Sequence, residues 1–146
     1  MEQIFQNKVA IVTGGSFGIG RATAIAFAKR GAKVMIADWV EDNETLNAIH
    51  ALGGEAVFFQ CDVSDETNVR IMVETTVKKF GRLDFAFNNA GVEGVSAPTH
   101  ECTEENWNRT IGVNLKGVWH CMKYEIPYML KQGKGAIVNN ASIAGL

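Results

Sequence analysis

The sequence has little of several features, and each shortage excludes a class of protein. Only two prolines occur among its 146 residues, low-complexity tracts are absent, and 47% of the residues are hydrophobic, which is the profile of a globular domain. No apolar stretch approaches the roughly 20 residues that a membrane-spanning helix requires. Residues 1–6 lack the basic and apolar regions of a signal peptide. We therefore expect a cytoplasmic protein without a membrane partner.

Patterns typical of metal sites and of nucleic-acid binding are also missing. The three cysteines are widely spaced and form no Cys-x-x-Cys pair, so neither a disulfide framework nor a zinc site is expected. The three histidines have no metal-ligand spacing, and we expect no metal site. The formal net charge is −2, and lysine and arginine are scattered along the chain. Because nucleic-acid binding needs a concentrated basic face, no nucleic-acid partner is expected.

What the chain does contain is a regular alternation of short apolar runs and helical stretches. This pattern predicts right-handed βαβ units in one domain over residues 1–146, an α/β fold with a doubly wound parallel sheet of Rossmann type and strand order 3-2-1-4-5. The expected strands cover residues 8–13, 33–37, 55–61, 84–88 and 135–140. The expected helices cover residues 18–30 and 41–52, a stretch from Ser64 to residue 80, and a long stretch that begins after Thr103.

Two of the helical stretches carry an apolar stripe at helical spacing. Ser64 and Thr103 are expected to cap them. The first stripe consists of Val69, Met72, Val73, Thr76, Val77 and Phe80. The second consists of Trp107, Ile111, Leu115, Val118, Met122, Ile126 and Leu130.

A glycine-rich turn joins the first strand to the first helix. Gly14 permits a tight turn, Gly18 lets the backbone approach a pyrophosphate, and Gly20 lets the helix pack closely against the strand. The helix that follows presents free N–H groups and the positive end of its dipole to phosphate. Placed between a buried strand and a helix, this turn predicts a dinucleotide site.

Asp38 lies at the end of the second strand, 18 residues after Gly20. A carboxylate at this place accepts hydrogen bonds from the ribose hydroxyls of adenosine and repels a 2′-phosphate. Neither Trp39 nor Phe17 supplies a positive charge that would hold such a phosphate. We therefore expect NAD as the cofactor, in preference to NADP.

The glycine spacing of residues 13–20 resembles the TGxxxGxG pattern of short-chain dehydrogenases/reductases, and further elements agree in kind and order. Asp62-Val63 resembles the adenine-side dipeptide of that family, and residues 88–91 match its NNAG element. Asn114 matches the helix asparagine, and Ser142 matches the catalytic serine. The resemblance implies that Ser142 binds the substrate oxygen and that Asn114 supports a proton relay. The expected cofactor-binding residues are Gly14, Ser16, Phe17, Gly18, Ile19, Gly20, Asp38, Trp39, Asp62, Val63, Asn88, Asn89, Ala90, Gly91 and Val113.

The resemblance also implies what the chain lacks. The reaction centre of the family is a Tyr-x-x-x-Lys pair whose tyrosine would fall beyond residue 146, and Tyr124 and Tyr128 precede Ser142 on another helix. We expect the chain to be truncated and inactive by itself. The parent would transfer hydride reversibly between NAD and a secondary alcohol or ketone as a homodimer or homotetramer.

Two alternatives use a similar glycine turn. A non-catalytic dinucleotide-binding sensor or module would keep the fold without the reaction centre. A methyltransferase would share the glycine turn and the acidic residue but would lack the NNAG element and the pair of Asn114 and Ser142.

Overall fold

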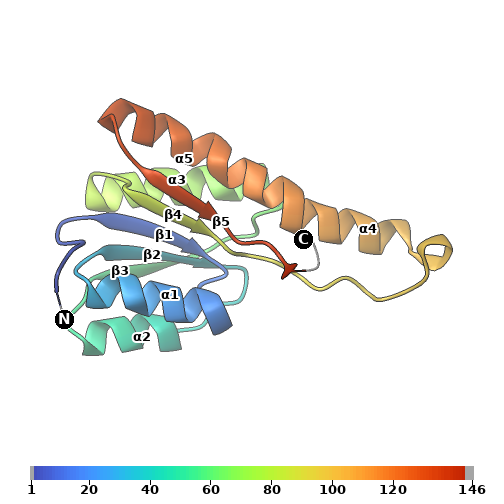
Figure 1. The fold of residues 1–146 in the computed structure, drawn as a ribbon, viewed down its shortest axis with the longest axis horizontal. Helices are drawn as coiled ribbons and strands as arrows, with labels where there is room; N and C mark the ends of the chain where they lie inside the picture. Colours follow the sequence, from blue (N-terminus) through green and yellow to red (C-terminus); the bar gives the residue numbers. More distant parts are fainter. Residues whose placement is uncertain (1, 144–146) are drawn as a thin grey trace.

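The computed structural model describes residues 2–143, which form a parallel sheet between two layers of helices (Figure 1). The sheet has five strands in the order β3-β2-β1-β4-β5, as the sequence predicts. The strands are β1 (Val9–Thr13), β2 (Lys33–Asp38), β3 (Ala56–Gln60), β4 (Phe85–Asn88) and β5 (Ala136–Asn139). All neighbouring strands pair in parallel, so all five carboxyl ends lie at one edge of the sheet.

Helices α1 (Gly18–Lys29) and α2 (Glu44–Ala51) cover one face of the sheet, and α3 (Glu66–Phe80) and α5 (Val118–Gln132) cover the other (Figure 1). Successive residues of a strand point to opposite faces, so the central strands are apolar throughout. Ile11 packs in the core under α3 and α5, whereas its neighbour Val12 packs in the core under α1 and α2. Both side chains are fully buried.

The first predicted stripe is confirmed, but its predicted cap is wrong. Val69, Met72, Val73 and Thr76 are buried along α3. The cap of this helix is Asp65, whose carboxylate accepts hydrogen bonds from the backbone N–H groups of Thr67 and Asn68. Ser64 instead donates its hydroxyl proton to Asp62, at an Oγ–Oδ1 distance of 2.7 Å. Asp and Ser are both favourable N-cap residues, so the sequence alone did not distinguish Ser64 from the adjacent Asp65.

The long helical stretch after Thr103 is not one regular helix. It consists of an α-helix, a π-helical segment and a second α-helix. A short 3-10 turn, η1 (Thr99–Glu101), precedes α4 (Glu104–Ile111), which Thr103 caps as predicted through its bond from the Asn106 N–H. A π-helical segment, η2 (Gly112–Gly117), then connects α4 to α5. Such π-helical segments are rare and occur frequently at functional sites.

The second predicted stripe does not face the sheet. Leu115 and Leu130 are 65% and 73% exposed, and Trp107 is 60% exposed. The face of α5 that packs inward carries Cys121, Glu125 and Met129, at a spacing of four residues. Both faces of this helix contain apolar residues, so periodicity alone did not identify the inner one.

At the amino ends of the strands, Asp84 fastens β1 to β4. Its Oδ2 accepts a bond of 3.0 Å from the backbone N–H of Val9, and both oxygens accept bonds of 2.6 Å from Arg82. The side chain is only 5% exposed. Burial alone would raise the pKa of Asp84, but the bonds from Arg82 and Val9 outweigh it and hold the pKa below its ordinary value of 3.8.

We expect Asp84→Ala to lower the free energy of unfolding by about 2–4 kcal/mol, because it leaves the donors of Arg82 and Val9 without an acceptor. Asp84→Asn keeps an oxygen for Val9 but loses the charge, so its cost should be smaller. The folded-state pKa of Asp84 is depressed, so the charge stabilises the fold above the unfolded pKa and this stability disappears as pH falls through the folded pKa. The difference in the free energy of unfolding between wild type and Asp84→Asn, measured with urea, should therefore become smaller as the pH is lowered. A difference in the free energy of unfolding that does not change with pH would show that the charge of Asp84 does not stabilise the fold.

Candidate functional site

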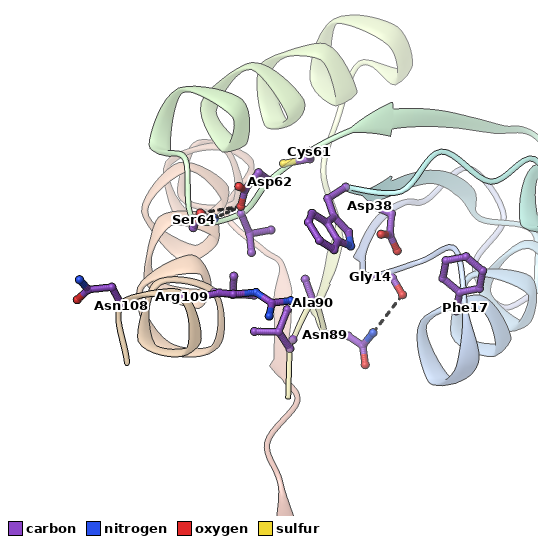
Figure 2. Close-up of a pocket in the computed structure, with 15 residues that line it drawn as sticks. Gly14, Phe17, Asp38, Cys61, Asp62, Ser64, Asn89, Ala90, Asn108 and Arg109 are labelled. Carbon is purple, nitrogen blue, oxygen red and sulfur yellow. Dashed lines mark hydrogen bonds between the residues drawn. The ribbon is translucent and has the colours of Figure 1, made fainter. Parts of the chain in front are cut away.

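A cavity of about 470 Å³ opens at the carboxyl ends of the strands (Figure 2). Its walls come from the segments that follow β1, β2, β3 and β4 and from the segment around η2. In open α/β sheets this edge is where ligands bind, and the volume is typical of small-molecule sites. The lining residues are Gly14, Phe17, Asp38, Trp39, Cys61, Asp62, Val63, Ser64, Asn89, Ala90, Gly91, Val92, Asn108, Arg109 and Val113.

The glycine turn after β1 can exist only with glycine at its key positions. Gly14 has a φ of +62°, and a Cβ there would lie 3.0 Å from the Cα of Ala90. A Cβ at Gly20 would overlap the carbonyl oxygen of Gly14. The sequence predicted that Gly20 lets the helix approach the strand. In the structure, Gly20 lies against the backbone of Gly14 in the turn. Gly18 differs, because its φ is +50° and a Cβ there would meet no atom within 4 Å.

The amino end of α1 begins directly after this turn. Phe17, the N-cap residue, has extended backbone angles, is 52% exposed and supplies no side-chain cap. Ile19 is 64% exposed on the first turn of the helix. The N-terminal amides of α1 therefore lack a side-chain acceptor, and an anion placed there would meet N–H groups and the positive end of the helix dipole.

Asn89, in the predicted NNAG element, ties the end of β4 to the glycine turn. Its backbone N–H and that of Ala90 donate to Thr13 Oγ1, at 2.9 and 3.1 Å. Its side-chain Nδ2 donates to the carbonyl oxygens of Thr13 and Gly14, at 3.1 and 3.3 Å. Figure 2 shows the bond between Asn89 and Gly14 among the residues that line the cavity.

Asp38 is held in place at the end of β2 by the backbone around it. Its Oδ2 accepts from the N–H of Ser16 at 3.1 Å, and its Oδ1 accepts from the N–H of Val40 at 3.2 Å. Ser16 is itself fully buried, and its hydroxyl donates to the Val40 carbonyl oxygen. A carboxylate has about four acceptor positions, so Asp38 keeps capacity for a ligand in the cavity.

Arg21, the arginine of α1, does not offer an unpaired positive charge to a ligand. Arg21 pairs with Asp42 and with Glu44, each at 2.5 Å, and also donates to the Ser16 carbonyl oxygen at 2.7 Å. These bonds hold the segment after β2 against the start of α1. The charge of Arg21 is consequently balanced within the protein.

The segment after β3 forms another wall of the cavity. Asp62 Oδ1 accepts from the backbone N–H of Ser64 at 2.9 Å as well as from its hydroxyl. Burial raises the pKa of Cys61 to about 12, and the charges of Asp62, Asp65 and Asp38 add to the effect. The Cys61 thiol in the wall is therefore neutral.

The two predicted catalytic residues lie outside the lining of this cavity. Asn114, within η2, is exposed, and its side chain makes two bonds to the backbone of Val92: Oδ1 accepts at 2.8 Å and Nδ2 donates at 2.9 Å. Asn106 holds the backbone of Val95 in the same way, at 2.8 and 3.0 Å. Ser142 is exposed, three residues after the last residue of β5. The two asparagines thus fix the loop that follows β4 against α4 and η2.

Of the other predicted cofactor residues, Val63 and Val113 line the cavity, whereas Asn88 is buried beneath it. The lining also includes residues that were not predicted to bind the cofactor: Cys61, Ser64, Val92, Asn108 and Arg109. Cys61, Ser64 and Val92 directly flank predicted elements. Arg109 lies one helical turn before Val113, so helical periodicity could have identified it. Figure 2 shows the Arg109 side chain extending toward Ala90.

Other kinds of site are not found in the described part of the chain. Residues 2–143 contain no group of three or more histidine, cysteine or acidic side chains placed to hold a metal ion. Within the same range, no helix is both long and apolar enough to cross a membrane.

Comparisons with known proteins agree with this architecture. Cyclohexanol dehydrogenase of Acinetobacter sp. (strain SE19) is 43% identical over 148 residues, covering 100% of this chain and 59% of the relative. Meso-2,3-butanediol dehydrogenase of Serratia marcescens is 40% identical, covering 97% of this chain and 56% of the relative. The crystal structure of NAD⁺-bound xylitol dehydrogenase superposes with a TM-score of 0.90 at 36% identity, covering 97% of this chain and 55% of that one.

The chain thus spans little more than half the length of these relatives. The family model described as short chain dehydrogenase matches residues 8–146. With this match and these identities, the chain belongs to the short chain dehydrogenase family.

Proposed function

We propose that this chain carries the dinucleotide-binding part of an oxidoreductase that uses NAD. The observation that supports the proposal best is the turn after β1, where a Cβ at Gly20 would overlap the Gly14 carbonyl while the space in front of Gly18 is open. Such a turn lets backbone amides approach a pyrophosphate closely. The open cavity beside it has room for the adenosine part of the cofactor. The residues present therefore fit a dinucleotide.

The charged groups at the end of β2 favour NAD over NADP. Asp38 lines the cavity at the end of β2 with acceptor capacity to spare, and ribose hydroxyls are suitable donors. A 2′-phosphate at the same place would meet this negative charge, while Arg21 is already paired with Asp42 and Glu44. Trp39, beside Asp38, adds an aromatic surface without charge.

The proposed reaction of the whole protein is reversible oxidation of a secondary alcohol to a ketone. The bound nicotinamide supplies the hydride chemistry. The names of the relatives, a cyclohexanol and a butanediol dehydrogenase, support small alcohols as substrates and count against a non-catalytic sensor. In this proposal Ser142 binds the substrate oxygen, Asn114 supports the proton relay, and the parent is a cytoplasmic homodimer or homotetramer.

Neither tyrosine of α5 is placed to exchange a proton at the cavity. The Tyr124 hydroxyl donates to Glu66 on α3 at 2.7 Å, and this bond raises the pKa of Tyr124. Tyr128 packs against the core under α3 and α5. We therefore propose that residues 1–146 bind NAD without turning it over. Isothermal titration with NAD, together with an assay of NAD reduction by secondary alcohols, tests this directly: failure to bind refutes the proposed function, and turnover refutes the need for a further tyrosine.

Asp38→Ala is expected to weaken NAD binding by about 10- to 100-fold, because hydrogen bonds to a charged group contribute about 1.5–3 kcal/mol. NADP should lose less affinity, since the repulsion of its 2′-phosphate disappears with the carboxylate. Titrations of tryptophan fluorescence with NAD and with NADP measure the ratio of the two affinities. Glu41→Ala is the matched control, because it removes an exposed carboxylate of the same segment outside the cavity. An unchanged ratio of the two affinities in Asp38→Ala would rule out this role.

Two glycine-to-alanine variants separate the roles within the glycine turn. Gly20→Ala should lower both the unfolding midpoint and NAD affinity, because the new methyl group displaces the Gly14 carbonyl. Gly18→Ala should cost only about 1–2 kcal/mol of stability from its left-handed backbone, yet weaken NAD binding at least tenfold, because the methyl group enters the space proposed for the pyrophosphate.

Gly53→Ala is the control for backbone strain. Gly53 also has a positive φ, +74°, and open space around it, but it follows α2 away from the cavity. Its stability loss should resemble that of Gly18→Ala with NAD affinity unchanged. If Gly18→Ala bound NAD as well as Gly53→Ala does, the pyrophosphate would have to lie elsewhere.

A further inference from the structure

One carboxyl group is enclosed between α5 and the sheet without a positive partner. Glu125 is fully buried, and its Oε2 accepts a bond of 3.1 Å from Nδ2 of Asn88, the last residue of β4. Its other oxygen, Oε1, has no hydrogen-bond partner among the described residues. Buried polar atoms are nearly always paired in native proteins, so this oxygen requires an explanation.

A second unpaired oxygen belongs to the same pair of side chains. Asn88 uses both of its side-chain N–H groups, one to Glu125 and one to Asn139 Oδ1 at 3.0 Å. The Asn88 carboxamide oxygen, Oδ1, is buried and has no partner within residues 2–143. A carboxylate and a carboxamide oxygen both only accept hydrogen bonds, so a charged Glu125 cannot satisfy either unpaired atom.

One proton satisfies both atoms. We propose that Glu125 is a neutral carboxylic acid in the folded protein, whose Oε1–H donates to Asn88 Oδ1 while its Oε2 accepts from Asn88 Nδ2. The acid and the amide then close a ring of two hydrogen bonds. The proton comes from solvent, and no other group has to change.

The surroundings of Glu125 favour the neutral form. Burial raises the pKa of Glu125 from 4.5 to about 7, and the bond from Asn88 offsets this only in part. A bond that only the acid form can donate favours that form further. The buried residues of α3 are Val69, Met72, Val73 and Thr76, which carry no charge.

The nearby titratable groups on α5 do not supply a positive partner. Cys121, one turn before Glu125, has its pKa raised well above its ordinary value by burial, so it is neutral. His120 bonds through Nδ1 to the Val63 carbonyl oxygen at 2.9 Å, and its Nε2 has no hydrogen-bond partner among the described residues, so His120 makes no bond to Glu125.

Neutral Glu125 acts as a positioning residue for the cofactor site. Asn88 directly precedes Asn89, which bonds to the glycine turn, and Asn88 also bonds to Asn139 at the end of β5. Holding the Asn88 amide from below therefore fixes the carboxyl ends of both strands. The consequence for dinucleotide binding rests on the proposed function, whereas the protonation of Glu125 does not.

Carbon-13 NMR of glutamate side chains tests the protonation directly in the unmodified chain. The Glu125 Cδ resonance, assigned by its loss in Glu125→Gln, should titrate near 7 or above, well above the ordinary glutamate value of 4.5. Titration of Glu125 at or below 4.5 would overturn the proposal. This readout is independent of whether the chain binds a dinucleotide.

Variants test the positioning role. Because the folded-state pKa is raised, the contribution of Glu125 to stability is full below 4.5 and is lost as pH rises through about 7. The urea midpoint and the NAD affinity of wild type should therefore fall across this range. Glu125→Gln, whose amide can donate and accept at every pH, should abolish this fall.

Glu125→Leu is the matched variant that removes both hydrogen bonds to Asn88. It should bind NAD at least fivefold more weakly than Glu125→Gln at every pH. An identical pH profile in wild type and Glu125→Gln would overturn the role of Glu125. Absence of NAD binding in all three proteins would instead refute the proposed function, and the NMR titration would still decide the protonation.

Discussion

The hydrogen bonds between Thr13 and Asn89 join the two strands at which the chain reverses its direction across the sheet. From β1 the chain first builds outward through β2 and β3, and then returns to place β4 and β5 on the other side. The loops after β1 and β4 therefore part in opposite directions, which creates a crevice between them. The Thr13 hydroxyl and the Asn89 amide keep this crevice at one width. That link sets the position of the two cavity walls that follow β1 and β4 relative to each other.

Much of the fold could be predicted from the sequence because the strands are buried on both faces. Runs such as residues 9–13 have no polar alternation, and only a parallel sheet covered on both sides accommodates them. The order of all five strands is confirmed. Likewise, the glycines of the turn and Asp38 were identifiable because their backbone conformation and their place at a strand end are local properties. Local sequence carries that kind of information.

The features that the sequence did not predict depend on contacts between distant segments. The two hydrogen bonds from the Asn114 side chain to the backbone of Val92 join residues 22 positions apart, and no local pattern signals them. Arg109 and Asn108 line the cavity from α4, a helix distant in sequence from the strand ends that form the other walls. Glu125 stands in an otherwise ordinary amphipathic stretch, and only its packing under β4 reveals that it is enclosed with Asn88. The π-helical segment likewise has no distinctive composition.

The neutral thiol of Cys61 has a consequence for the chemical durability of the cavity. Alkylating reagents and peroxides attack cysteine as the thiolate, and a thiol with a pKa near 12 supplies almost none of it at physiological pH. Cys121 is sheltered in the same way, whereas Cys102 is exposed at the surface. Oxidative damage to the described cysteines would therefore begin at Cys102 and leave the wall beside Asp62 intact.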